Sequence, residues 1–166
     1  HGDIIVCLDE SGSTKGENAE WGKALALAVQ DICAHEGRKF ALIHFSGAGQ
    51  IRTDRFLPGQ YTFADLLSAA EHFFDGGTDF EAPVREALRL INEEEFEDAD
   101  ILFITDGKRS ISDELAEQLQ NAVHDARCYV VGLLLDADDP GLTFSLEKFC
   151  ERVYRTSQIA EGRIEA

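Results

Sequence analysis

The chain has 166 residues and a mass of 18.4 kDa, which fits one globular domain, since domains average about 150 residues. Apolar residues make up 44% and charged residues 28% of the sequence, as in folded soluble proteins. The net charge of −17 repels phosphate backbones and anionic lipid headgroups, so we expect neither nucleic acid nor a membrane as a partner. The apolar runs are far shorter than the ~20 residues needed to cross a bilayer.

Cysteine and methionine usage bears on the environment of the protein. The four cysteines lie far apart in apolar or helical segments, at Cys7, Cys33, Cys128 and Cys150. This spacing predicts buried, reduced thiols in a cytoplasmic protein. The sequence contains no Met, so we do not expect His1 to be the native first residue, and we interpret the chain as a domain of a longer protein. We expect the isolated domain to be monomeric.

Short apolar runs and helical periodicity alternate along the chain. Strands are predicted, in chain order, at residues 4–8, 39–46, 50–57, 100–105, 127–135 and 152–156. Helices are predicted at residues 18–35, 62–74, 81–95 and 111–126, with an acidic turn at 136–140 and a short helix ending at Cys150. In the first helix, Trp21 is interpreted as a core anchor in an apolar stripe with Leu25, Ala28, Val29 and Ile32.

Strands that are apolar on both faces and alternate with helices predict a mainly parallel sheet covered on both sides. The predicted fold class is therefore α/β: a doubly wound, Rossmann-like sheet with one antiparallel edge strand, at residues 50–57, and helices on both faces. We assign residues 1–156 to this domain and residues 157–166, which lack a core pattern, to a C-terminal tail. In such sheets ligands bind outside the carboxyl ends of the strands.

Three polar clusters fall at that predicted edge: residues 9–13 (DESGS), 76–79 (GGTD) and 105–107 (TDG). Asp9 and Asp106 end two strands that this topology places side by side. Their carboxylates would share one crevice and repel each other, and a divalent cation between them would remove the repulsion.

The other oxygen atoms of these clusters indicate which cation is expected. Two carboxylates and the hydroxyls of Ser11, Ser13 and Thr78 form an all-oxygen set. Such a set suits Mg²⁺, with Mn²⁺ or Ca²⁺ as alternatives, rather than Zn²⁺.

Glycines in two of these loops are expected to let the backbone turn sharply, at Gly12, Gly76 and Gly77. An alternative is that Asp9 and the serines only turn the loop and cap the helix that follows. We favour the metal site because three clusters share one predicted edge.

These D-x-S-G-S, G-G-T-D and T-D-G motifs resemble those of a von Willebrand factor A (VWA) domain, and the similarity extends from Asp3 to about Thr156. The resemblance implies a metal-ion-dependent adhesion site (MIDAS) made by Asp9, Ser11, Ser13, Thr78 and Asp106. In that family the serines and usually the threonine bind the metal directly, while the acids can act through water. A Glu or Asp of a partner protein takes the remaining coordination position, so the resemblance implies a non-catalytic binding module.

The resemblance also suggests a setting and a partner. IIVCLDESGS, ALIHFS and FDGGTD are most similar to intracellular bacterial VWA proteins encoded with MoxR-class AAA+ ATPases, which implies that ATPase or its client as the partner. Thr14 departs from those relatives, which often have Met there. Around the metal residues we expect five rim residues that tune its affinity: Glu10, Gly12, Gly77, Asp79 and Gly107.

A Mg²⁺-dependent phosphotransfer enzyme or a receiver-like domain using Asp9 is the alternative, because aspartyl-phosphate enzymes also place an Asp after the first strand. Haloacid-dehalogenase-like enzymes have D-x-D there, whereas Ser11 leaves this chain without the general acid. For a receiver, Lys108 follows the wrong strand.

The histidines show no metal-ligand spacing, and we interpret them as surface residues or as internally bonded core residues. They are His1, His35, His44, His72 and His124.

Overall fold

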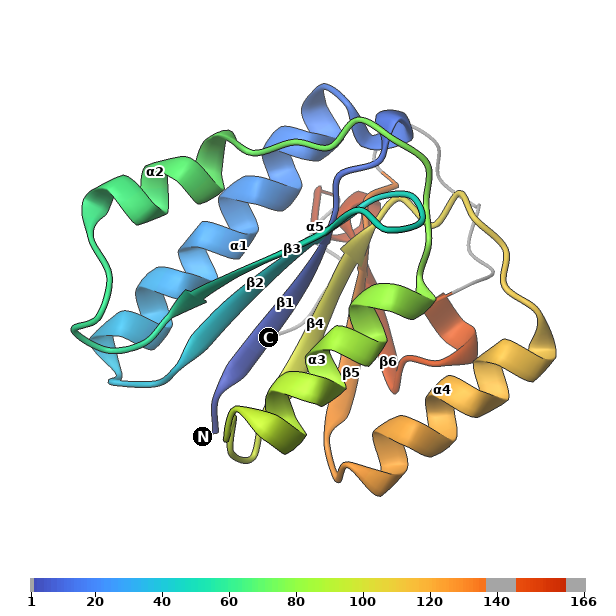
Figure 1. Cartoon of the computed structure of the whole chain (residues 1–166). Helices are drawn as coiled ribbons and strands as arrows, with labels where there is room; N and C mark the ends of the chain where they lie inside the picture. Colours follow the sequence, from blue (N-terminus) through green and yellow to red (C-terminus); the bar gives the residue numbers. More distant parts are fainter. Residues whose placement is uncertain (1, 137–145, 161–166) are drawn as a thin grey trace.

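The computed structural model describes residues 2–136 and 146–160, in which helices cover a central sheet (Figure 1). The strands are β1 (Ile4–Asp9), β2 (Phe40–Phe45), β3 (Ile51–Phe56), β4 (Asp100–Thr105), β5 (Tyr129–Leu134) and β6 (Arg152–Arg155). The α-helices are α1 (Glu17–His35), α2 (Phe63–Glu71), α3 (Glu81–Glu93), α4 (Asp113–Asp125) and α5 (Thr156–Ala160). Two short 3₁₀ turns are η1 (Gly12–Thr14) and η2 (Leu146–Lys148).

The sheet has the strand order β3-β2-β1-β4-β5-β6. All neighbouring strands run parallel except β3, which is antiparallel to β2 at the edge. The predicted fold class is therefore confirmed. Leu8 of β1 lies opposite Ile104 of β4, so the residues that follow them, Asp9 and Thr105, meet at the carboxyl edge of the sheet.

Two apolar cores lie on the two faces of the sheet, because side chains alternate in direction along each strand. In β1, Ile5 and Cys7 belong to the core under α3 and α4, whereas Val6 and Leu8 belong to the core under α1 and α2. Figure 1 shows these helix pairs on opposite sides of the sheet. The same alternation directs Glu10, which follows β1, toward α1 and α2.

The apolar stripe that was predicted to face the core from α1 is partly wrong. Trp21 and Ile32 are 43% and 54% exposed, so Trp21 is not a core anchor. The helix instead buries the small residues Gly22 and Ala26. A Cβ atom at Gly22 would lie only 2.9 Å from Cδ1 of Leu8, so the helix axis comes closer to the sheet than large side chains would permit.

Several element boundaries differ from the prediction. A capping box at Thr62 starts α2, as expected, but the helix ends at Glu71, three residues early. The segment from Ser157, predicted to be a tail, begins within the short helix α5, where the Ser157 hydroxyl donates to Asp136 at 2.9 Å. Most of the predicted acidic turn at 136–140 lies outside the described residues.

Three of the four cysteines are buried, as predicted. Cys7, Cys33 and Cys128 are buried and Cys150 is half-buried, all four without a disulfide. Burial raises the pKa of Cys128 to about 11. Within residues 2–136 and 146–160, every helix is too short or too polar to cross a membrane.

Candidate metal centre

Three loops meet at the carboxyl edge of the sheet, where Figure 1 shows the turns after β1 and β4 beside the segment that enters α3. The backbone joins two of them: the N–H of Gly12 donates to the carbonyl of Gly76 at 2.9 Å, and that of Asp75 donates to the carbonyl of Glu10 at 2.9 Å. Ser11 and Gly76 also form a parallel bridge. These contacts position the D-x-S-G-S loop against the G-G-T-D loop.

Asp9 is fixed by bonds from two neighbouring strand ends. Its Oδ1 accepts from the N–H of Ser11 at 2.8 Å, and its Oδ2 accepts from the hydroxyl of Thr105 at 2.5 Å. Burial raises the pKa of Asp9 to about 6, and the negative charge of Asp106 adds to the rise, while the bonds from Thr105 and Ser11 oppose it. The hydroxyls of Ser11 and Ser13 lie 3.0 Å apart in the same loop.

Asp106 has a carboxylate oxygen without a hydrogen-bond partner among the described residues. Its side chain is nearly buried, at 3% exposure, and Oδ1 accepts from the N–H of Lys108 at 3.0 Å. Within residues 2–136 and 146–160, Oδ2 is buried without a hydrogen-bond partner. A buried, unpaired carboxylate oxygen beside a second carboxylate is unstable unless a cation lies nearby.

Thr78 lies on the G-G-T-D loop, half-buried, and lines a cavity of about 470 Å³ together with Asp79 and Gly47. Ser46, which follows β2, holds this loop in place. Its hydroxyl donates to the carbonyl of Gly77 at 2.7 Å and accepts from the N–H of Gly76 at 3.0 Å. These two bonds of Ser46 hold the backbone beside Thr78. Within the described residues, no hydrogen bond joins the Thr78 side chain to Asp9 or to Asp106.

Gly12, Gly76 and Gly77, which were expected to let the backbone turn sharply, all have no positive φ. Small size matters at Gly76, where a Cβ would lie 2.2 Å from Oε1 of Gln50. At Gly12 a Cβ would lie 3.1 Å from Oδ1 of Asp75. Gly107 does have a positive φ, 70°, and its N–H donates to the Thr105 hydroxyl at 3.0 Å.

The two acids predicted to line the rim have different surroundings. Asp79 lies just before α3, and its Oδ1 accepts from the N–H groups of the first two helical residues, Glu81 and Ala82, at 3.0 and 3.5 Å. Glu10 is 1% exposed and lies within a network of charged side chains on the α1 and α2 side of the sheet.

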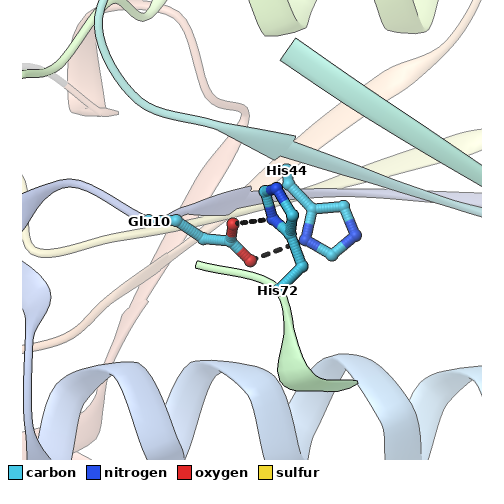
Figure 2. Close-up of side chains that lie close together, drawn as sticks. All are labelled: Glu10, His44 and His72. Atoms are coloured by element: carbon cyan, nitrogen blue, oxygen red, sulfur yellow. Dashed lines mark hydrogen bonds and ion pairs between the residues drawn. The ribbon is translucent and has the colours of Figure 1, made fainter. Parts of the chain in front are cut away.

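Glu10 brings together two histidines whose positions in the sequence did not predict a pair. Its Oε2 lies 2.6 Å from Nδ1 of His44, and its Oε1 lies 2.6 Å from Nδ1 of His72, as Figure 2 shows. His44 is an internally bonded core residue, one of the two interpretations given for the histidines. The sequence did not predict that both rings contact one carboxylate. The two histidines are 28 residues apart, on β2 and after α2, so only the folded topology reveals their proximity.

Lys23 of α1 completes this network. Its ammonium donates to Oε2 of Glu10 at 2.8 Å and to the carbonyls of Ala69 and His72 at 2.8 and 2.7 Å. Those carbonyls end α2, where a positive charge is favourable. Burial alone would raise the pKa of Glu10, but His44 and Lys23 hold it below its usual value.

Comparison with known proteins agrees with the fold and the motifs. The family model for the von Willebrand factor type A domain matches residues 4–108, a region that includes all three polar clusters. The uncharacterized protein MJ0077 of Methanocaldococcus jannaschii is 37% identical over 119 residues, which are 72% of this chain and 29% of that protein. The chain spans about a third of the length of the curated relatives it matches.

Solved structures show the same fold at low identity. The VWA domain of SpRpn10 has a TM-score of 0.71 at 12% identity and covers 93% of this chain and 87% of that one. The mussel byssus protein PTMP1, solved with a zinc-occupied MIDAS motif, has a TM-score of 0.61 at 15% identity, over 98% of this chain and 46% of that one.

The fold and the loops at its carboxyl edge define a doubly wound α/β domain of the metal-binding, protein-interaction class. The chain belongs to the von Willebrand factor type A domain family. Domains of this family are generally non-enzymatic interaction modules.

Proposed function

We propose that this domain binds Mg²⁺ at a MIDAS formed by Asp9, Ser11, Ser13, Thr78 and Asp106, and uses it to bind an acidic side chain of a partner protein. The observation that supports the proposal most directly is the buried, unpaired Oδ2 of Asp106 next to the buried carboxylate of Asp9.

The residues present fit a hard divalent cation. The donors at this edge are carboxylate and hydroxyl oxygens, which Mg²⁺ prefers. Thr105 and the backbone of Ser11 orient the Asp9 carboxylate, and the Lys108 N–H orients Asp106. When bound, Mg²⁺ would neutralise the two carboxylates and offer a coordination position to an oxygen atom of the partner.

The charge of the chain explains why an acidic partner would need this metal. At −17, the domain repels a Glu or Asp side chain unless a cation reverses the potential locally. Asp79 is held by its own bonds and would shape the rim, whereas the Glu10 side chain is directed toward α1 and α2 and would act on the rim only through the backbone of its loop. A MoxR-class AAA+ ATPase, or its client, is the partner that the sequence motifs favour.

The phosphotransfer alternative is less consistent with the geometry. Both carboxylate oxygens of Asp9 already accept hydrogen bonds, from Ser11 and Thr105, which makes Asp9 a poor nucleophile. An enzyme of that kind would hydrolyse a generic phosphomonoester, and Asp9→Asn would abolish the hydrolysis.

Metal binding can be tested with Mn²⁺, a paramagnetic substitute for Mg²⁺. In two-dimensional amide NMR spectra, we expect Mn²⁺ to broaden the signals of residues 9–13, 76–79 and 105–108 first. Asp9→Ala should remove this selective broadening, whereas Asp75→Ala, which alters an exposed acid in the adjacent loop, should retain it. Equal broadening in wild type and Asp9→Ala would contradict the site.

Partner binding is a separate test. A purified MoxR-class ATPase should bind the immobilised domain in Mg²⁺ but not in EDTA, and Asp9→Ala should not bind. If Asp9→Ala binds as well as wild type in Mg²⁺, the metal does not bridge the two proteins.

A further inference from the structure

The network around Glu10 contains three side chains arranged as metal ligands, on the opposite side of β1 from the proposed MIDAS. One ligand atom from each of Glu10, His44 and His72 lies within 4.8 Å of the other two. A tetrahedral Zn²⁺ with bonds near 2.1 Å holds its ligand atoms about 3.4 Å apart. Small side-chain movements would therefore bring all three atoms to one ion.

The two nitrogens of His44 both face carboxylates. Nδ1 lies 2.6 Å from Glu10, and Nε2 lies 2.7 Å from Oδ2 of Asp54. His44 is 0% exposed, so both of these contacts lie inside the core, and a metal ion bound at Nδ1 would take the place of the contact with Glu10.

The opposite side of the His44 ring has the support that metal-binding histidines usually have. Nε2 is directed at Asp54, and Arg52 donates to the same carboxylate at 3.0 Å. A carboxylate bonded to the distal nitrogen of a ligating histidine fixes the ring and increases its basicity. The antiparallel pairing of β2 with β3 places Arg52 opposite His44 and brings Asp54 within its reach.

Glu10 and His72 complete a possible ligand set. Lys23 and His44 contact Oε2 of Glu10, whereas Oε1 faces His72, so Oε1 can bind an ion while Lys23 stays in place. His72 is partly exposed and, with Lys23, lines a groove of about 450 Å³ between α1 and α2. This groove gives an ion a path from solvent.

We propose that Glu10, His44 and His72 form a second metal site, which takes Zn²⁺. Two imidazole nitrogens and one carboxylate favour Zn²⁺ over Mg²⁺, which prefers oxygen ligands. The ion joins the end of β1, the carboxyl end of β2 and the end of α2. It thereby restrains residues 73–79, which lead from α2 to Thr78. The site is chemically distinct from the MIDAS and does not depend on it.

The test uses Asp9→Ala throughout, because a MIDAS can also hold zinc, as in the mussel protein. Zn²⁺ affinity is measured by calorimetry in excess Mg²⁺, for Asp9→Ala alone and with His72→Gln, Asp54→Asn or His35→Gln. His35 is an exposed histidine of α1 and serves as the control. We expect one Zn²⁺ per chain in Asp9→Ala and in the His35→Gln control. Asp54→Asn should bind about 10–100-fold more weakly, and His72→Gln more weakly still.

Zinc K-edge absorption of the wild-type chain in excess Mg²⁺ tests the same site without any substitution. Coordination by two imidazole nitrogens is expected, and a purely oxygen environment would overturn the proposal. Absence of Zn²⁺ binding in Asp9→Ala, or equal affinity with and without His72→Gln, would also overturn it. Retained Mg²⁺ binding by His72→Gln alone would show that the two sites are separate and that the variant is folded.

Discussion

Asp9 is a carboxylate placed where its charge is unfavourable in the metal-free chain. Burial and the neighbouring Asp106 raise its pKa to about 6, from 3.8 for an ordinary Asp. The folded state therefore binds this proton more tightly than the unfolded state does. Below pH ~4 the group has no effect on stability; as the pH rises from about 4 to about 6 it progressively destabilises the folded state, and above about pH 6 the destabilisation is constant.

The first prediction concerns Asp9→Asn in EDTA at pH 7. The substitution removes the buried charge and keeps the shape, so it should increase the free energy of unfolding by about 1–3 kcal/mol. At pH 4 the difference from wild type should nearly vanish. Urea denaturation at both pH values measures the change. A variant that is less stable than wild type at pH 7 in EDTA would contradict this account of Asp9.

Lys23 is the residue on which the Glu10 network depends. Its three donors satisfy one buried carboxylate and two carbonyls at the end of α2. Removing one partner of a buried pair leaves the other charge without compensation, which is more destabilising than loss of a surface pair.

Lys23→Met should therefore lower the free energy of unfolding by about 3 kcal/mol. The matched control is Lys39→Met, which loses an exposed bond to the carbonyl of Glu95 and a contact with the Phe96 ring at 5.7 Å, and should change stability by less than ~1 kcal/mol. Urea denaturation of both variants distinguishes them. Similar losses in the two would mean that the network is not a stabilising element.

At the scale of elements, the packing of α1 depends on small residues. A Cβ at Gly22 would lie 2.9 Å from Leu8, 3.4 Å from Ile104 and 3.6 Å from Leu135. The helix therefore crosses β1 and β4 at close range, and it positions the D-x-S-G-S loop that precedes it.

Gly22→Leu should consequently destabilise the domain by about 1–3 kcal/mol through overpacking, despite the higher helix propensity of Leu. The control Ala28→Leu, on the exposed face of the same helix, should change stability by less than ~0.5 kcal/mol. Thermal and urea unfolding both report the difference. No loss in Gly22→Leu would show that α1 can move away from the sheet without cost.

The same helix shows where sequence patterns fail. Its central ALALAV segment is apolar on most sides, so periodicity alone does not decide which stripe faces the sheet. The prediction chose the large side chains, including Trp21, whereas the close approach to the sheet selects Gly22 and Ala26. Strands were easier to predict, because residues such as those of β2 are buried on both faces.

At the scale of the whole molecule, the α/β topology could be predicted, and with it the edge where Asp9 and Asp106 lie. The motif residues are close in sequence to strand ends, and parallel strands bring those ends together. Contacts between side chains that are far apart in the sequence could not be predicted. Thr105, Ser46 and the pair of His44 with His72 reveal their roles only through neighbours from distant segments.

Binding of a divalent cation by the three loops can be measured as a change in the thermal midpoint of unfolding between EDTA and excess Mg²⁺. With Mg²⁺ at ten times its dissociation constant, binding stabilises the folded state by about 1.4 kcal/mol, or roughly 3–5 °C for a chain of this size. We predict this rise for wild type and for the Asp75→Ala control, and no rise for Asp9→Ala. An equal rise in Asp9→Ala, or none in wild type at saturating Mg²⁺, would contradict the claim.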